Sequence, residues 1–134
     1  MLWTSKDNRY AFAVLALLFP DLDYKNGDFH QDHCHPLSNF DEKKLKSKGV
    51  IINKDNLEYY TDPDYFNSVI NLQMLDGNEN TSKGAKALKT WVEESSPSRK
   101  KHYLPNYLEF TEFPRFVEER IKLLKKKLTQ ELIF

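Results

Sequence analysis

The sequence predicts an α+β domain in which two short strands lie among helices, with a long amphipathic helix at the C-terminus. Its length of 134 residues is typical of one domain that buries its own core. Residues 29–34 and 71–75 have the short patterns of strands, bounded by turn-forming residues. Near the C-terminus, apolar residues recur every three or four positions, which is the period of a helix.

The first elements are a helix and a strand. Asp7 or Asn8 can cap a helix over residues 10–19, which Pro20 ends. The apolar side chains of this helix fall on most of its faces, so we expect it to be buried. An Asn-Gly turn then leads into the first strand, residues 29–34.

The middle of the chain is less regular. Residues 37–60 are mostly polar, apart from a strand-like segment at 50–52. Thr61 can cap a helix that has Pro63 in its first turn, and the second strand, residues 71–75, follows.

Two helices are expected in the C-terminal part. Asn80 or Thr81 can cap the first, which places Leu88 and Trp91 on one side. The second begins near Pro114, and its lysines lie largely opposite an apolar stripe. The stripe consists of Phe113, Val117, Ile121, Leu124, Leu128 and Leu132.

The charges are divided unevenly, although the formal net charge is zero. Residues 1–82 contain 8 basic and 13 acidic side chains, whereas residues 83–127 contain 12 basic and 6 acidic ones. A basic half is typical of a surface that faces phosphates. A solvated helix face accounts equally well for the three lysines at 125–127.

Cysteine content and hydropathy restrict the compartment. Cys34 is the one cysteine, so an internal disulfide and a paired-cysteine zinc site are both excluded, and a reducing, cytoplasmic compartment is favoured. We expect Cys34 to be a small buried residue rather than a nucleophile. The longest apolar run is shorter than the roughly 20 residues that span a membrane, so no membrane association is expected.

The most informative motif is the pair Asp32 and His33, followed at a distance by Asn71 and Asn80. An isolated Asp-His pair is common and carries little information. Carboxylate and amide oxygens are ligands for a hard cation, however, and an imidazole beside them can take a proton from water. The combination favours a metal-dependent phosphodiesterase site.

Two segments carry a resemblance to a known family. They are Asp32-His33-x-x-Pro36 on the first strand, and a segment that runs from Asn71 through Asn80 to Lys83. The order strand, loop, strand, helix with these residues resembles the HNH endonucleases, also called ββα-metal or His-Me finger nucleases. The resemblance implies a single nuclease domain, residues 1–134, with a ββα-metal core at about 29–94 embedded in a helical scaffold at 1–28 and 98–134.

Within that superfamily, the chain is most similar to the C-terminal nuclease domain of GmrSD-type modification-dependent restriction enzymes. The similarity rests on a DHxHP segment, an NLQxLxxxEN segment and a KG pair, followed by Trp91. Such enzymes normally carry a large N-terminal domain. A separate recognition or NTPase domain or subunit is therefore an expected partner, together with DNA that could be modified foreign DNA.

The resemblance implies a role for each site residue. His33 is expected as the general base, and Asp32 and Asn80 as the ligands of a single Mg²⁺ or Mn²⁺. Asn71 is expected to brace the loop or to orient His33. His35 is either a second metal-side or phosphate-binding group or a structural residue.

Basic residues of the second half are expected to contact the nucleic-acid backbone without reading its sequence. His102 lies in the same basic stretch and is expected to be a nucleic-acid contact or a surface residue. The candidate backbone contacts are Lys83, Lys86, Lys89, Arg99, Lys100 and Lys101.

The function that the sequence predicts is a divalent-metal-dependent DNA endonuclease, the nuclease module of a restriction or anti-phage defence system. The first alternative is a catalytically inactive, nuclease-like module that binds nucleic acid or a partner protein through its basic half. A further alternative is a structural metal site made by His30, His33 and His35. Removal of the metal by a chelator would then unfold the domain.

Overall fold

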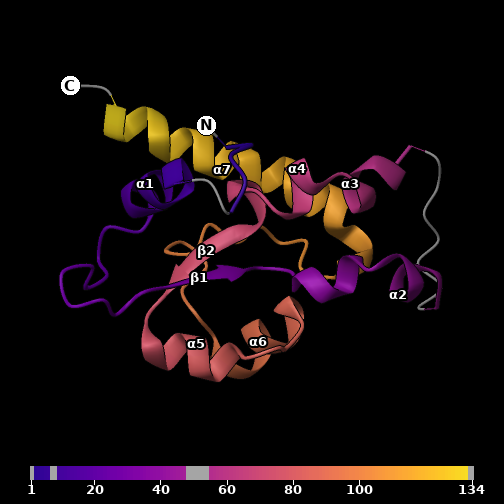
Figure 1. Ribbon diagram of the computed structural model, residues 1–134, viewed down its shortest axis with the longest axis horizontal. Coiled ribbons are helices and arrows are strands. Elements are labelled where there is room, and N and C mark those ends of the chain that lie inside the picture. The colour runs from indigo at the N-terminus through magenta and orange to yellow at the C-terminus, as the bar shows by residue number, and fades with distance from the viewer. Residues whose placement is uncertain (1, 7–8, 48–54, 133–134) are drawn as a thin grey trace.

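The computed structural model describes residues 2–6, 9–47 and 55–132 of the chain (Figure 1). The predicted α+β class, the two short strands and the long C-terminal helix are confirmed. The elements in chain order are α1 (Arg9–Leu18), β1 (His30–His33), η1 (Leu37–Phe40), α2 (Glu42–Ser47), α3 (Leu57–Thr61), α4 (Pro63–Phe66), η2 (Val69–Asn71), β2 (Leu72–Leu75), α5 (Gly77–Lys83), α6 (Leu88–Ser95), η3 (Phe110–Glu112) and α7 (Phe113–Leu132).

The two strands form a small antiparallel sheet between two layers of helices. In Figure 1, α1 and α7 lie on one side of the sheet, and α5 and α6 lie on the other. The register pairs His30 with Leu75 and His33 with Leu72. All four residues of β2 are buried, because helices cover both of its faces. The sheet therefore holds β1 in a fixed position against α5, which contacts both strands.

Helix α1 is less deeply buried than its sequence predicts. Its inner face, including Ala11 and Leu15, lies in the core, but Tyr10, Phe12 and Leu17 are exposed. The expectation of burial on most faces is wrong, because α1 packs mainly against α7, β2 and η2 and leaves Tyr10, Phe12 and Leu17 exposed. The predicted caps at residues 7 and 8 and the strand-like segment at 50–52 lie outside the described residues.

The middle segment contains more helix than expected. Helices α2 and α3 form where an irregular chain was predicted. Thr61 ends α3, and its hydroxyl donates to the Leu57 carbonyl inside that helix. Asp62 caps α4 instead, since its carboxylate accepts the Asp64 backbone N–H.

Helix α5 begins four residues earlier than a cap at Asn80 predicts. Asp76 caps it, and Glu79 completes a capping box by accepting the Asp76 backbone N–H. Asn80 is therefore an internal residue of α5 rather than its cap. Gly84 ends α5 with a positive φ of 50°, so α5 and α6 are two helices and not one.

Arg120 fixes α7 to the rest of the fold. Its guanidinium is fully buried and donates to four backbone carbonyls, those of Val69, Ile70, His102 and Tyr103. These bonds join α7 to η2 and to the loop that precedes η3. Within the described ranges, no helix has both the length and the apolar composition needed to cross a membrane.

Candidate functional site

Asp32, on β1, interacts with two residues, Gln73 and Lys83, and the sequence alone does not indicate either contact. The register places Asp32 opposite Gln73, whose side-chain amide donates to Asp32 Oδ2 over 2.9 Å. The ammonium of Lys83, in the last turn of α5, lies 3.0 Å from the same oxygen. The side chain of Asp32 is 16% exposed and that of Lys83 only 1% exposed. The carboxylate thus sits at the edge of the interior with an opposite charge beside it.

Lys83 is not the phosphate contact that the sequence suggests. Besides Asp32, its ammonium donates to the His33 carbonyl oxygen over 2.9 Å. An ammonium at this depth needs such partners, because burying an unpaired charge is very costly. Lys83 is the last residue of α5, and its ammonium points inward to β1, where its charge is paired with the carboxylate of Asp32.

His33 follows Asp32 on β1 and is half-buried. Its Nε2 lies 2.8 Å from Oδ1 of Asn67, the residue that ends α4. Burial is the main cause that lowers the pKa of His33 below its ordinary value of 6.5, and the hydrogen bond with Asn67 opposes it. If Asn67 Oδ1 accepts from Nε2, the ring is the neutral tautomer with its lone pair on Nδ1. Nδ1 is then the nitrogen that can take a proton.

Asn71 braces the loop after β1. Its side chain accepts the His35 backbone N–H and donates to the carbonyls of His35 and Phe66, all at 2.8–3.0 Å. Asn71 is fully buried, so it joins β1 to the end of α4 in a site without competing water. Of the two roles expected for Asn71, the structure gives it the bracing one.

His35 is a core residue. It is 1% exposed, and its ring packs edge-on against Phe113 and Phe116. Burial lowers its pKa to about 3, so the ring is neutral at physiological pH. Of the two roles left open for His35, this placement supports the structural one. Cys34 beside it is also fully buried, as expected.

Asn80 precedes Lys83 by three residues on α5. Side chains three residues apart in a helix are neighbours on one face, and Lys83, three residues after Asn80, reaches Asp32. Asn80 is half-buried. The fold therefore places Asp32 against α5, the helix that carries Asn80, although 48 residues of sequence separate Asp32 from Asn80. The ring of His33 bonds instead to Asn67, at the end of α4.

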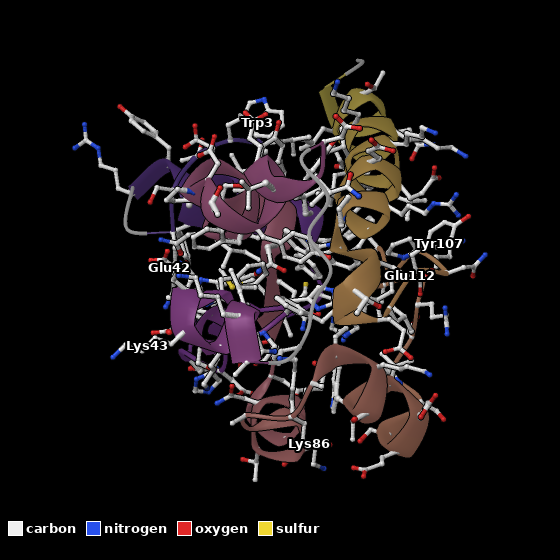
Figure 2. The ribbon with its side chains drawn as sticks, turned by 90° about the vertical axis from the view of Figure 1, so that its right-hand side faces the viewer. Trp3, Glu42, Lys43, Lys86, Tyr107 and Glu112 are labelled. Atoms are coloured by element: carbon white, nitrogen blue, oxygen red, sulfur yellow. The ribbon has the colours of Figure 1, made fainter. Side chains whose placement is uncertain are left out.

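The other basic candidates lie on the surface, and several already have acidic partners. Lys86 pairs with Glu94, and Figure 2 shows it at the outer end of the α5–α6 layer. Lys89 pairs with Glu93 and with Glu109. These exposed pairs contribute little to stability and leave the ammonium groups accessible.

Lys101 and His102 meet the helix that carries Asn80. The Lys101 ammonium lies 3.8 Å from Glu79, and His102 Nε2 lies 2.8 Å from the other carboxylate oxygen of Glu79. His102 is fully buried, so the expectation of a surface or nucleic-acid contact is wrong. Burial lowers the pKa of His102, and the bond with Glu79 opposes this effect. The basic residues that precede His102 in the sequence do not indicate that its side chain is buried.

Sequence reasoning missed two residues of this region, Gln73 and Asn67. Gln73 had a usable signal, since a polar residue inside an apolar strand needs a partner across the sheet. Asn67 had none, because its contact with His33 depends on where α4 ends. Among the described residues, no group of three or more His, Cys, Asp or Glu side chains could hold a metal ion, so His30, His33 and His35 do not form such a cluster.

Comparison with known families and with curated proteins finds no match to this chain.

Proposed function

We propose that this protein is a divalent-metal-dependent endonuclease of the HNH type that hydrolyses phosphodiester bonds in DNA. The observation that carries the proposal is the succession of Asp32 and His33 on β1, with Asn80 on α5, the helix that contacts this strand and pairs with Asp32 through Lys83. The proposal uses two oxygen donors, Asp32 and Asn80, and one neutral imidazole, that of His33.

The donor set fits a hard cation. Asp32 and Asn80 offer a carboxylate and an amide oxygen, which Mg²⁺ and Mn²⁺ accept while keeping positions for water and phosphate. Both contacts to Asp32 are made by Oδ2, so Oδ1 is the oxygen that a cation would use. When bound, a cation supplies stabilisation of the negative charge that develops on the phosphate and on the leaving oxygen.

His33 does the proton chemistry in this proposal. Its neutral ring accepts a proton from the attacking water at Nδ1, while Asn67 holds the ring through Nε2. Asn71 holds the backbone that follows His33, which keeps β1 from shifting against α4. Lys83 holds the carbonyl of His33 and one oxygen of Asp32, so it positions both groups.

The biological setting of the proposal rests on the resemblance to GmrSD-type enzymes. In this proposal the protein is the nuclease module of a cytoplasmic restriction or anti-phage system. It acts on foreign DNA together with a separate recognition or NTPase domain or subunit. The accessible lysines of α6 and of the preceding loop support a polyanionic substrate.

The alternative is an inactive module that binds nucleic acid or a protein, and one observation favours it. Lys83 already neutralises Asp32 at 3.0 Å, so the carboxylate is satisfied without a metal. A positive charge at this distance also weakens the attraction of a second cation.

Cleavage of supercoiled plasmid in Mg²⁺ or Mn²⁺ separates the two readings. The test variants are Asp32→Asn and Asn80→Ala. The matched control is Asn78→Ala, an exposed residue on the same helix. The enzyme reading predicts metal-dependent nicking by the wild type and by Asn78→Ala, but not by the two test variants. Absence of metal-dependent nicking by all four folded proteins in every metal would support the inactive module.

A further inference from the structure

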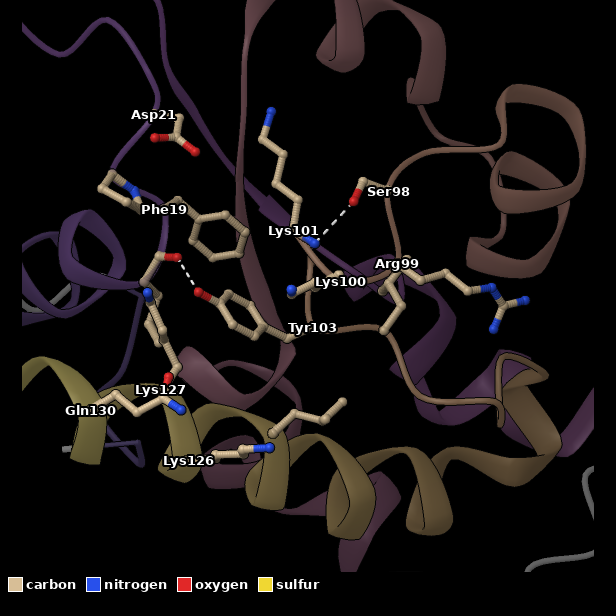
Figure 3. Close-up of a pocket in the computed structure, with 14 residues that line it drawn as sticks. Phe19, Asp21, Ser98, Arg99, Lys100, Lys101, Tyr103, Lys126, Lys127 and Gln130 are labelled. Atoms are coloured by element: carbon tan, nitrogen blue, oxygen red, sulfur yellow. Dashed lines mark hydrogen bonds between the residues drawn. The ribbon is translucent and has the colours of Figure 1, made fainter.

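A pocket of about 800 Å³ lies between the end of α1, the loop before η3, and the C-terminal half of α7. We call it the basic pocket. Figure 3 shows Phe19 and Asp21 on one side of it, residues 98–101 on another, and Lys126, Lys127 and Gln130 along α7. Its charged lining residues are Asp21, Arg99, Lys100, Lys101, Lys126 and Lys127. The described residues that line it do not include Asp32, His33 or Asn80, so it is separate from the candidate metal site.

The lining has five cationic side chains and one carboxylate. Lys127 is paired with Glu131, and Arg99 donates to the Pro105 carbonyl. Among the described residues, Lys100 and Lys126 make no ion pair. Like charges gathered around one hollow repel each other and create a positive potential there. An anion in the hollow would remove that repulsion.

The walls of the pocket are held in place without a ligand. The guanidinium of Arg120 donates hydrogen bonds to the carbonyls of His102 and Tyr103. The Tyr103 hydroxyl donates to the Leu18 carbonyl, which closes the loop onto α1 (Figure 3). Tyr103 also has a φ of 54°, a conformation that costs a non-glycine residue free energy and is found preferentially at functional sites. The lysines are thus mounted on a fixed loop and a fixed helix.

The same loop reaches the helix of the candidate site. Lys101 lines the pocket and also lies 3.8 Å from Glu79, while His102 bonds to Glu79 at 2.8 Å. Glu79 directly precedes Asn80 on α5. A chain of phosphates that leaves the pocket past Lys101 would therefore arrive at α5.

The pocket also has an apolar wall, to which Leu18, Tyr103 and Leu123 contribute. Leu123 is 39% exposed, so it gives a ligand an apolar contact. The volume lies within the roughly 300–1,000 Å³ of small-ligand sites. Phosphates with a flat apolar group attached, as in a nucleotide, match this combination of walls.

We propose that the basic pocket binds phosphate groups of a nucleic-acid strand, through Lys100 and Lys126, at a distance from the bond that is cut. The proposal rests on the proposed function, because it assigns the pocket to the substrate of the same enzyme. A free nucleotide shares the phosphate chemistry, and the experiment separates the two sources.

The test is binding of a labelled single-stranded DNA of about 15 nucleotides, followed by fluorescence anisotropy in chelator so that no cleavage occurs. The length follows the site sizes of single-strand binding proteins. The test variant is Lys100→Gln/Lys126→Gln. The control is Lys43→Gln/Lys44→Gln on α2, which removes the same charge from exposed lysines; Figure 2 shows Lys43 pointing away from the body. Both pairs are exposed, so the four substitutions should leave the fold intact, as circular dichroism would check.

Loss of two phosphate contacts should weaken binding about 25-fold at 0.1 M salt and reduce the salt slope by about 1.4, whereas the control changes both much less. Equal weakening in the two variants, or none in the test variant, would overturn the proposal. The assignment to a strand would be overturned if AMP bound as tightly as the DNA and lost that binding in Lys100→Gln/Lys126→Gln. Because the readout needs no metal, a pocket that fails while plasmid is still cut leaves the nuclease proposal intact, and the reverse result leaves the pocket intact.

Discussion

Replacing Lys83 with methionine tests how the site is held together. Methionine has similar length and no charge, so Lys83→Met leaves the carboxylate of Asp32 with the amide of Gln73 as its remaining hydrogen bond among the described residues. It also removes the hydrogen bond that Lys83 donates to the His33 carbonyl. Removing one partner of a buried ion pair costs about 3–5 kcal/mol. Asp32 retains 16% exposure and one hydrogen bond, which places the expected loss near the lower end, at about 3 kcal/mol.

The loss can be measured as a change in the free energy of unfolding by urea and as a change in Tm on heating, each followed by tryptophan fluorescence and by circular dichroism. An unfolding entropy of about 2.1 cal/mol/K per residue gives roughly 0.28 kcal/mol/K for this chain, so 3 kcal/mol corresponds to a fall in Tm of about 10 °C. Lys86→Met is the matched control. It breaks an exposed pair with Glu94 and should cost less than about 1 kcal/mol.

The double variant Lys83→Met/Asp32→Asn refines the test. With both charges removed, no unpaired carboxylate remains, so the double variant should be more stable than Lys83→Met alone. The reasoning is refuted if Lys83→Met loses no more stability than Lys86→Met, or if Asp32→Asn restores none of the loss.

Three other changes have defined outcomes. Burial lowers the pKa of His35 to about 3, from an ordinary 6.5. Between these pH values the unfolded chain binds a proton at this residue and the folded chain does not. The contribution of the neutral ring to the free energy of unfolding is therefore fully present above pH 6.5 and falls by up to about 5 kcal/mol toward pH 3. His35→Phe should flatten that decline in unfolding experiments across this pH range; an unchanged slope would contradict the burial of a neutral ring. Asn71→Ala removes three buried hydrogen bonds and should cost about 3 kcal/mol or more in urea unfolding, against less than 1 for Asn78→Ala. Asn67→Ala should slow plasmid cleavage about 10- to 100-fold and move the acid limb of the pH–rate profile to lower pH, since the bond from Asn67 raises the pKa of His33; a shift to higher pH would count against that bond.

The sheet and the first strand residues could be predicted because their signals are local. Alternation and turn residues define strands, and the adjacency of Asp32 and His33 needs no tertiary information. The start of α5 was misjudged because Asn80 and Asp76 are both good caps, and only Asp76 has a glutamate three residues later to complete a capping box.

The burial of Lys83 could not be predicted from its neighbours. In the sequence it stands among residues typical of an exposed helix end, and its partner Asp32 lies far away on another element. The same holds for His102, whose inward turn depends on Glu79 and on the carbonyl bonds of Arg120. Charge pairs between distant residues produce no periodic pattern in the sequence. The candidate metal ligands and base were therefore easier to predict than the residues that hold them in position.

The central claim is that His33 is the base of a metal-dependent nuclease, and one comparison tests it most directly. The rate at which supercoiled plasmid is nicked in Mn²⁺ is measured for the wild type, for His33→Ala and for His30→Ala. His30 is the exposed residue at the other end of β1, so its variant controls for loss of a histidine from the same strand. The account predicts that His30→Ala cuts like the wild type and that His33→Ala is about 10²- to 10⁴-fold slower. Folded His33→Ala that cuts at the wild-type rate would contradict it.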